Sequence, residues 1–204
     1  MYHRPMDGTL PDVTAFILAG GKSTRMGADK AFVVLDSRTL LQRALDLGRA
    51  IAADVRIVGD AAKFAAFGPV VEDVFPGCGP LAGIHAALRG SKTELNLMLA
   101  VDVPFVSQAL LEYLIGRARD VASATVTVAK SGGNWQPLCA VYRREFANAA
   151  QEALQAGRYR IDLLFAATST QIVEEEELDA AGFSAKMFRN LNTRAELEAV
   201  RGVL

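Results

Sequence analysis

The amino-acid sequence predicts an α/β protein with a mostly parallel central sheet and helices on both of its faces, which is a three-layer α/β/α architecture. Short apolar and β-branched runs of strand length alternate along the chain with segments whose apolar residues recur at helical spacing. The run at residues 95–101 is apolar on both faces, as expected in the middle of a parallel sheet. A chain of 204 residues is long enough to bury a real core.

The expected elements follow one another in order, and local signals fix several of their ends. Residues 13–19 form the first buried strand, which stops at a pair of glycines. Pro80 suits the first position of a helix, Ser107 suits an N-cap, and Thr193 starts a T-x-x-E capping box. The later elements are helices over residues 39–53, 80–88, 107–114, 144–155 and 193–200, and strands over residues 55–58, 70–71, 95–101, 124–129, 138–142 and 171–173.

Composition and organisation exclude several classes of protein. No linker or repeat divides the chain, so a single domain is expected over residues 13–204, after a flexible tail at residues 1–12. The tail lacks the apolar stretch of a signal peptide, and no apolar run approaches the ~20 residues of a membrane helix. A net charge of −1 gives no reason to expect nucleic-acid binding. Cys78 and Cys139 are expected to be reduced thiols in a cytoplasmic protein without a structural zinc site.

The loop after the first strand is the strongest chemical signal. Residues 18–30 read LAGGKSTRMGADK. Paired glycines let backbone N–H groups face a phosphate, and Lys22, Arg25 and Lys30 supply positive charge for a triphosphate that leaves as pyrophosphate. The loop is neither a Walker A nor a GxGxxG motif. Taken as a glycine pair alone, it would be an ordinary turn with incidental surface cations.

The full string, LAGG-x-x-x-RMG-x-DK, resembles the signature loop of the GT-A-like nucleotidyltransferases, and most of all that of the MobA-type molybdenum cofactor guanylyltransferases. The resemblance extends from residue 13 to about residue 200 and implies a Rossmann-like nucleotidyltransferase fold. It implies that Arg25 and Lys30 are catalytic, while Lys22 could point into solvent. The loop residues that it places on the nucleotide are Leu18, Ala19, Gly20, Gly21 and Lys30.

Asp102 stands just past the strand at residues 95–101, and ligands of open α/β sheets bind at the carboxyl ends of strands. A carboxylate there suits Mg²⁺, which takes hard oxygen ligands and often only one or two from the protein. The alternative is a turn residue whose carboxylate accepts backbone hydrogen bonds. The DVPF sequence from Asp102 resembles the family's D-x-P-[FY] element, which implies that Asp102 binds the metal and nucleotide and is catalytic.

Two further segments are expected near the nucleotide. Asp73 follows the strand at residues 70–71, at the place where the family has an Asp that contacts the nucleotide. The alternative is that Asp73 is an acidic loop residue that faces solvent. The GPLAG sequence at residues 79–83 resembles a family element, and the resemblance implies that Gly79, Pro80 and Leu81 contact the base or ribose. The alternative is that these residues only mark the start of a helix. His85, one turn later, is expected to be a packed or surface histidine and not a catalyst.

The acceptor side depends on weaker segments. Gln136 and Pro137 begin a QPLCAVY segment that resembles the family's approach to the acceptor pocket, and Asn190 and Asn192 belong to an NLNT segment that resembles its N-x-N-T-P closing motif. The closing segment could equally be a turn and a helix cap. The chain departs from the family at Arg194, where proline is usual, and in the sequence VGD at residues 58–60, where some members have a nucleotide-contacting Asn.

The resemblance implies transfer of GMP from GTP, with Mg²⁺, to the terminal phosphate of molybdopterin, with or without molybdenum, and release of pyrophosphate. Molybdenum-insertion and molybdoenzyme maturation proteins are the partners that it implies. One alternative is a cytidylyltransferase or other NTP-transferase of the same fold that acts on molybdopterin or a sugar or polyol phosphate, but such relatives more often have LAAG at the loop. Another is a non-catalytic GTP-binding regulatory protein, which the intact charged residues Arg25, Lys30, Asp73 and Asp102 disfavour.

Overall fold

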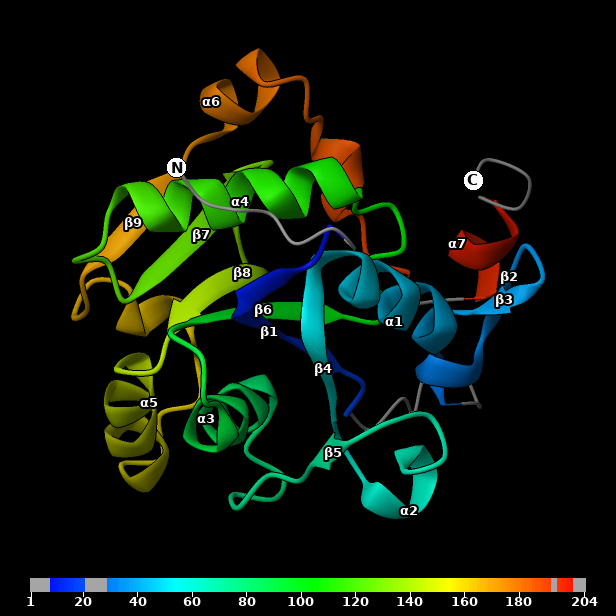
Figure 1. The fold of residues 1–204 in the computed structure, drawn as a ribbon, viewed down its shortest axis with the longest axis horizontal. Helices are drawn as coiled ribbons and strands as arrows, with labels where there is room; N and C mark the ends of the chain where they lie inside the picture. The colour runs from blue at the N-terminus through cyan, green and yellow to red at the C-terminus, as the bar shows by residue number, and fades with distance from the viewer. Residues whose placement is uncertain (1–7, 21–28, 192–193, 200–204) are drawn as a thin grey trace.

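A computed structural model describes residues 8–20, 29–191 and 194–199, and a seven-stranded sheet forms the middle of this part of the chain (Figure 1). The strand order is β5-β4-β1-β6-β8-β7-β9. Strand β8 runs antiparallel to β6 and β7, and the other neighbours are parallel, so the prediction of a mostly parallel sheet is confirmed. The strands are β1 Leu10–Leu18, β4 Ala52–Val58, β5 Val70–Val71, β6 Leu95–Ala100, β7 Val126–Ser131, β8 Asn134–Arg143 and β9 Thr170–Val173.

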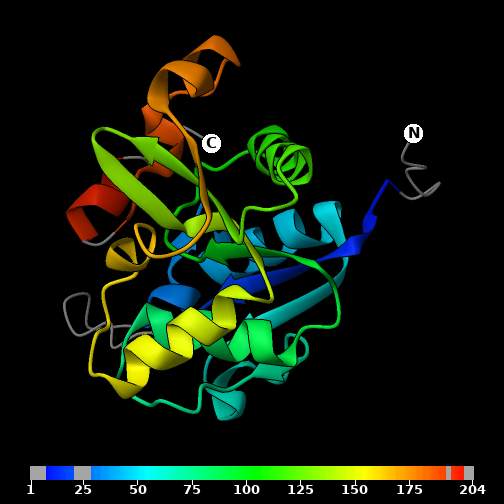
Figure 2. The ribbon, with the colours of Figure 1, turned by 90° about the vertical axis from the view of Figure 1, so that its left-hand side faces the viewer.

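Four helices cover the two faces of this sheet. Helices α1 (Leu40–Ile51) and α4 (Gln108–Asp120) pack together on one face, and α3 (Pro80–Gly90) and α5 (Phe146–Gln155) pack together on the other. Figure 2 shows the sheet between the two pairs of helices. The predicted three-layer α/β/α architecture is therefore confirmed.

Local signals place the helix ends as expected. Helix α1 begins near its expected start, where Thr39 and Gln42 form a complete capping box that was not predicted. The Ser107 hydroxyl accepts a hydrogen bond from the Leu110 amide at 3.2 Å and caps α4. Helix α7 (Arg194–Glu198) occupies the expected closing position, although Thr193 lies outside the described residues.

The expected start of the first strand was wrong. Strand β1 begins at Leu10, which pairs with Ala52, and not at residue 13. Asp12 also accepts hydrogen bonds from Arg119 of α4 at 2.7 and 2.8 Å. Leu10 and Asp12 are therefore held by contacts with distant segments of the chain, which the local sequence does not indicate.

Several one- or two-turn elements have no periodicity in the sequence and were not predicted. The β2–β3 hairpin turns through Asp36 (φ 47°) and Ser37 (φ 69°), which are not glycines. The short elements are η1 Lys30–Phe32, β2 Val34–Leu35, β3 Arg38–Thr39, α2 Ala61–Phe64, η2 Asp162–Leu164, α6 Glu175–Ala180 and η3 Ala185–Phe188. None of the described helices is both long and apolar enough to cross a lipid bilayer.

His85 is packed inside the α3–α5 layer, which confirms one of its two expected positions. Its side chain is 4% exposed, and its ring meets the Phe75 ring edge-on at 5.3 Å. Neither ring nitrogen has a hydrogen-bond partner among the described residues; the Gln151 side chain lies nearby, outside hydrogen-bonding geometry. Burial lowers the pKa of His85, with a further contribution from Arg89, while Gln151 acts in the opposite direction.

We expect this histidine to make the protein sensitive to acid. Because the pKa of His85 is lower in the folded than in the unfolded chain, the unfolded state binds more protons once the pH falls below about 6.5. The free energy of unfolding should then fall, by at most about 1.4 kcal/mol per pH unit for one proton. Urea unfolding at pH 7.5 and pH 5.0 should show a smaller fall for His85→Leu than for the wild type. Equal falls in the two proteins would contradict the expectation.

Candidate active site

The carboxyl ends of three neighbouring strands meet at one edge of the sheet. Leu18 at the end of β1 lies opposite Val58 of β4 and Ala100 of β6. The amides of Ala19 and Gly20 both donate to the Val58 carbonyl, at 3.0 and 3.1 Å. The first part of the predicted phosphate loop is therefore anchored by its backbone at the edge where ligands of open α/β sheets bind.

The loop residues predicted to bind the nucleotide differ in what they can offer. Leu18 and Ala19 are 8% and 6% exposed, so little of either residue is open to a ligand. Gly20 is exposed. Gly21 and Arg25 lie outside the described residues, as does Lys22. Their predicted roles remain predictions.

Lys30 and Asp102 form the central pair of this edge. The Lys30 ammonium donates a hydrogen bond to Asp102 Oδ2 at 3.0 Å, and each side chain is 21% exposed. Lys30 is the last residue of the phosphate loop and the first of η1, and Asp102 follows β6. The tertiary structure thus joins the two described residues that the sequence predicts to be catalytic.

The donor set at this edge fits a magnesium ion that the protein holds jointly with a nucleotide. The described residues contain no group of three or more His, Cys, Asp or Glu side chains placed to hold a metal by themselves. Mg²⁺ is commonly bound by one or two carboxylates together with substrate phosphates and water, so Asp102 alone is a sufficient protein ligand. The Asp102 carbonyl also accepts from the Leu191 amide at 2.9 Å, which fixes its backbone.

The start of α3 lies against the same edge. A Cβ atom at Gly83 would come within 3.1 Å of Val58 Cγ1, so the first turn of α3 packs closely on the end of β4. Gly79 has φ +75°, a conformation that favours glycine, and no side chain caps the helix that follows it. Leu81 is 0% exposed, so no part of this residue is open to solvent, and its nucleotide contact remains a prediction.

Asp73 lies beyond the end of β5, at this edge of the sheet, and is exposed. Its neighbour Glu72 is used differently: Glu72 Oε1 accepts from the Ala61 amide at 3.0 Å and supports the start of α2. Asp73 is therefore the acid of this pair left facing solvent, and its nucleotide contact remains a prediction.

The packing around Gly59 explains one departure from the family pattern. A Cβ atom at Gly59 would come within 2.8 Å of the Phe64 ring, and Phe64 is 1% exposed. An asparagine side chain has no room there while Phe64 keeps its place. Asp60 instead caps α2 by accepting from the Ala62 amide at 2.9 Å.

We expect Gly59→Ala to destabilise the protein by about 1–3 kcal/mol, because the added methyl group must displace a buried aromatic ring. Gly116→Ala is the matched control, since a Cβ there meets nothing within 4 Å in the helix interior, and it should stabilise by up to about 1 kcal/mol. Urea denaturation of both variants measures the difference. Equal stability of the two variants would show that Phe64 gives way easily.

The predicted acceptor residues reach the same edge from two directions. Leu99 of β6 pairs with Cys139 of the antiparallel β8, so Gln136 and Pro137, which precede Cys139, lie beyond the carboxyl end of β6. The Gln136 side chain turns back toward the hairpin and donates to the Asn134 carbonyl at 3.3 Å. Asn190 is exposed and adjoins the Leu191 amide that binds the Asp102 carbonyl. Asn192 lies outside the described residues.

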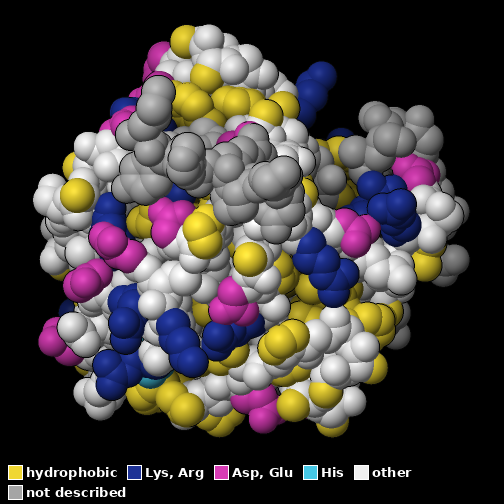
Figure 3. Space-filling view, in the orientation of Figure 1, with side chains coloured by type: hydrophobic (Ala, Val, Ile, Leu, Met, Phe, Trp, Pro, Cys, Tyr) yellow, Lys and Arg dark blue, Asp and Glu magenta, His cyan; other side chains and the backbone are white. Residues whose placement is uncertain are grey.

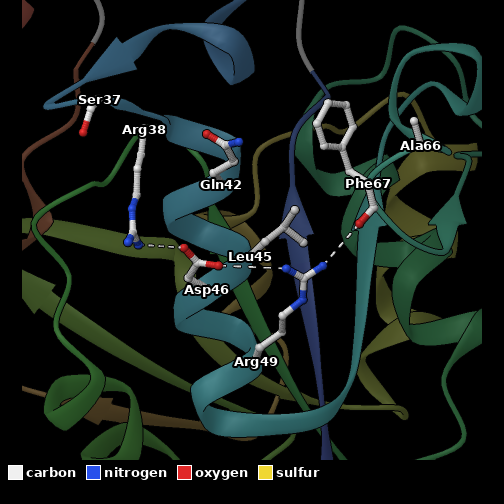
Figure 4. Close-up of a pocket in the computed structure, with 8 residues that line it drawn as sticks. All are labelled: Ser37, Arg38, Gln42, Leu45, Asp46, Arg49, Ala66 and Phe67. Atoms are coloured by element: carbon white, nitrogen blue, oxygen red, sulfur yellow. Dashed lines mark hydrogen bonds and ion pairs between the residues drawn. The ribbon is translucent and has the colours of Figure 1, made fainter.

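The surface has hollows away from this edge. One, of about 460 Å³, lies between α1, the β2–β3 hairpin and Phe67, and none of the predicted site residues lines it (Figure 4). Asp46 pairs there with Arg38 at 3.0 Å and with Arg49 at 3.9 Å, so its charges largely satisfy one another. Figure 3 shows basic and acidic side chains intermixed on this face of the molecule. Neither feature indicates a second site for a strongly charged ligand.

Sequence reasoning missed one residue that contacts the phosphate loop. Lys63 of α2 forms an ion pair with Asp29, with 2.9 Å between Nζ and Oδ2. The two residues are 34 positions apart, and no motif connects them. An aspartate directly before the lysine predicted to be catalytic was the available signal, because a carboxylate at that place needs a partner.

Comparison with known proteins gives likenesses over most of the chain. Residues 15–170 match the family described as the MobA-like NTP transferase domain. A molybdenum cofactor guanylyltransferase of Desulfosudis oleivorans is 34% identical over 195 residues, which cover 94% of this chain and 96% of that protein. A structure of molybdopterin-guanine dinucleotide biosynthesis protein A from Archaeoglobus fulgidus has a TM-score of 0.82 at 26% identity and covers 93% of this chain and 97% of that chain. A CMP:2-keto-3-deoxy-manno-octonic acid synthetase solved with CTP has a TM-score of 0.70 at 14% identity, covering 94% of this chain and 97% of that chain, which is a likeness of fold alone.

Proposed function

The chain belongs to the family of MobA-like NTP transferase domains, and from this premise we propose that it transfers GMP from GTP to the terminal phosphate of molybdopterin. Pyrophosphate and the guanine dinucleotide form of the cofactor are the products. The observation that supports the proposal most directly is the contact between Lys30 and Asp102, at the edge where the phosphate loop leaves β1. It joins a cation suited to phosphates with a carboxylate suited to magnesium.

The reaction needs little more from the protein than positioning and positive charge. An oxygen of the acceptor phosphate is already deprotonated near neutral pH, so no general base is required. This oxygen forms a bond to the α-phosphorus of GTP, and the bond from that phosphorus to the bridging oxygen breaks with its electron pair on pyrophosphate. Lys30 would stabilise the triphosphate and the negative charge that leaves, with Arg25 in the same role.

Asp102 is the residue that would hold Mg²⁺, together with phosphate oxygens of the nucleotide. When bound, the ion would neutralise charge on the reacting phosphates. The backbone amides after Leu18 and the start of α3 would contact the nucleotide, the latter on the base or ribose side. Gln136, Pro137, Asn190 and Asn192 would meet the acceptor.

A pyrophosphate-release assay tests the proposal. Purified protein is incubated with MgCl₂ and either GTP or CTP, each with and without molybdopterin. We expect release only with GTP and acceptor together. Preferential use of CTP would instead support cytidylyl transfer, and GTP binding without release under any of these conditions would support a regulatory protein.

The remaining assignments are predictions of the same proposal. A guanylyltransferase of this cofactor would hand its product to proteins that mature molybdoenzymes, and it would meet the proteins that insert molybdenum. Co-purification from cells would test these associations. A cytoplasmic location, which such partners would require, can be checked by cell fractionation.

A further inference from the structure

The segment that holds Lys30 is tied to a short neighbouring element whose role the proposed reaction does not explain. Asp29 precedes Lys30, and both of its carboxylate oxygens are used. Oδ1 accepts from the Ala31 amide at 3.2 Å as the N-cap of η1, and Oδ2 accepts from Lys63 Nζ at 2.9 Å. The carboxylate therefore ties the first turn of η1 to α2.

An aromatic contact holds the other end of η1. The Phe32 ring stacks on the Phe64 ring at 5.7 Å with an interplanar angle of 25°, and it meets the Phe67 ring at 5.8 Å. Phe64 is 1% exposed and belongs to the core, whereas Phe32 is 39% exposed. Lys30 thus lies between an ion pair on one side and an aromatic stack on the other, and both come from residues 63–67.

The element that supplies these contacts is itself fixed to the sheet. Asp60 accepts from the Ala62 amide at 2.9 Å, and Glu72, beyond β5, accepts from the Ala61 amide at 3.0 Å. The Gly59 amide donates to the Val71 carbonyl at 3.1 Å. Helix α2 is therefore attached to the ends of β4 and β5 and can transmit their position to η1.

We propose that Lys63 and Phe32 are positioning residues, which hold the backbone of Lys30 so that its ammonium group is directed toward Asp102 and the phosphates of the nucleotide. A lysine side chain is long and flexible, so a fixed backbone restricts the volume that its ammonium group samples. The Lys63–Asp29 contact is on the surface and contributes little to folding. Loss of this contact should therefore change nucleotide binding and not the stability of the fold.

Kinetics of Lys63→Met test the inference, which rests on the proposed function only for the identity of the substrates. We expect the KM for GTP to rise about fivefold while the KM for the acceptor stays unchanged. The Kd for GTP, titrated in MgCl₂ without acceptor, should rise by a similar factor. Lys63→Arg should restore most of the loss, because it keeps the charge next to Asp29.

Arg38→Met is the matched control, since Arg38 forms an equally short ion pair, 3.0 Å to Asp46, on a surface away from the site (Figure 4). It should leave both KM values unchanged. Phe32→Ala should raise the KM for GTP as Lys63→Met does. In a double-mutant cycle, Lys63→Met should have no further effect once Asp29→Asn is present.

An unchanged KM and Kd for GTP in Lys63→Met would overturn the inference, as would an equal rise in the KM for the acceptor or an equal effect of Arg38→Met. Thermal melting of each variant separates these outcomes from misfolding; the Lys63 side chain is 52% exposed, so its loss should leave the melting temperature nearly unchanged. If the wild type prefers CTP, the proposed function fails, and the same titrations with CTP still decide the positioning role.

Discussion

Asp102→Ala is expected to lower kcat for pyrophosphate release at least about a hundredfold, because it removes the carboxylate that would hold the metal on the reacting phosphates. Asp102→Asn should lose nearly as much, since the neutral amide keeps the shape of the side chain but not its charge. Pyrophosphate release at saturating GTP, MgCl₂ and molybdopterin measures both. The fold should survive, since the Leu191 amide binds the backbone carbonyl of Asp102 and not its side chain.

Asp46→Asn is a matched control for this prediction. Asp46 also forms a 3.0 Å ion pair with a basic side chain, but on the outer surface of α1. We expect unchanged activity, and a change in the free energy of unfolding below about 1 kcal/mol. Retention of more than a tenth of wild-type activity by Asp102→Ala would show that the metal does not depend on this carboxylate.

Lys30→Met should have the second large effect. It keeps most of the length of the side chain but removes the positive charge from the phosphates, so kcat/KM for GTP should fall by about a hundredfold. Lys30→Arg should recover part of this loss, because it keeps a charge on a side chain of different shape. Steady-state kinetics over a range of GTP concentrations provide the comparison.

The contact between Lys30 and Asp102 adds a second consequence that can be measured without turnover. The Lys30 ammonium lies 3.0 Å from Asp102 Oδ2, where it opposes the approach of a second cation. Lys30→Met should therefore bind Mn²⁺ more tightly than the wild type when no nucleotide is present, as measured by electron paramagnetic resonance of free Mn²⁺. Weaker or equal Mn²⁺ binding would show that the ammonium group does not compete for this carboxylate.

The order of strands along the chain could largely be predicted, because a local sequence pattern marks each strand. The β6 run is buried at every position, and β1 stops where its apolar run meets Gly20. The N-cap predicted at Ser107 is confirmed. The short elements were not predicted, because a single turn of helix or a two-residue strand has too few residues to show a periodic pattern of apolar side chains.

The candidate site was predicted residue by residue, but not as an arrangement. The resemblance picked out Lys30 and Asp102 separately, and the structure shows that they touch although they are 72 positions apart. The same resemblance put Leu81 on the nucleotide, whereas the whole residue is 0% exposed in the structure. The absence of an Asn from residues 58–60 is explained for position 59 by the Phe64 ring, which fills the space next to Gly59.

By itself, the sequence determined the alternation of strands and helices and predicted the chemistry of the phosphate loop, because both depend on residues close together in the chain. The tertiary structure decided which side chains meet at the sheet edge. It placed β8 antiparallel next to β6, joined Leu191 to Asp102, and brought Lys63 to Asp29. Such contacts depend on the order of strands in the sheet and on the path of the connections between them, for which neighbouring residues in the chain provide no signal.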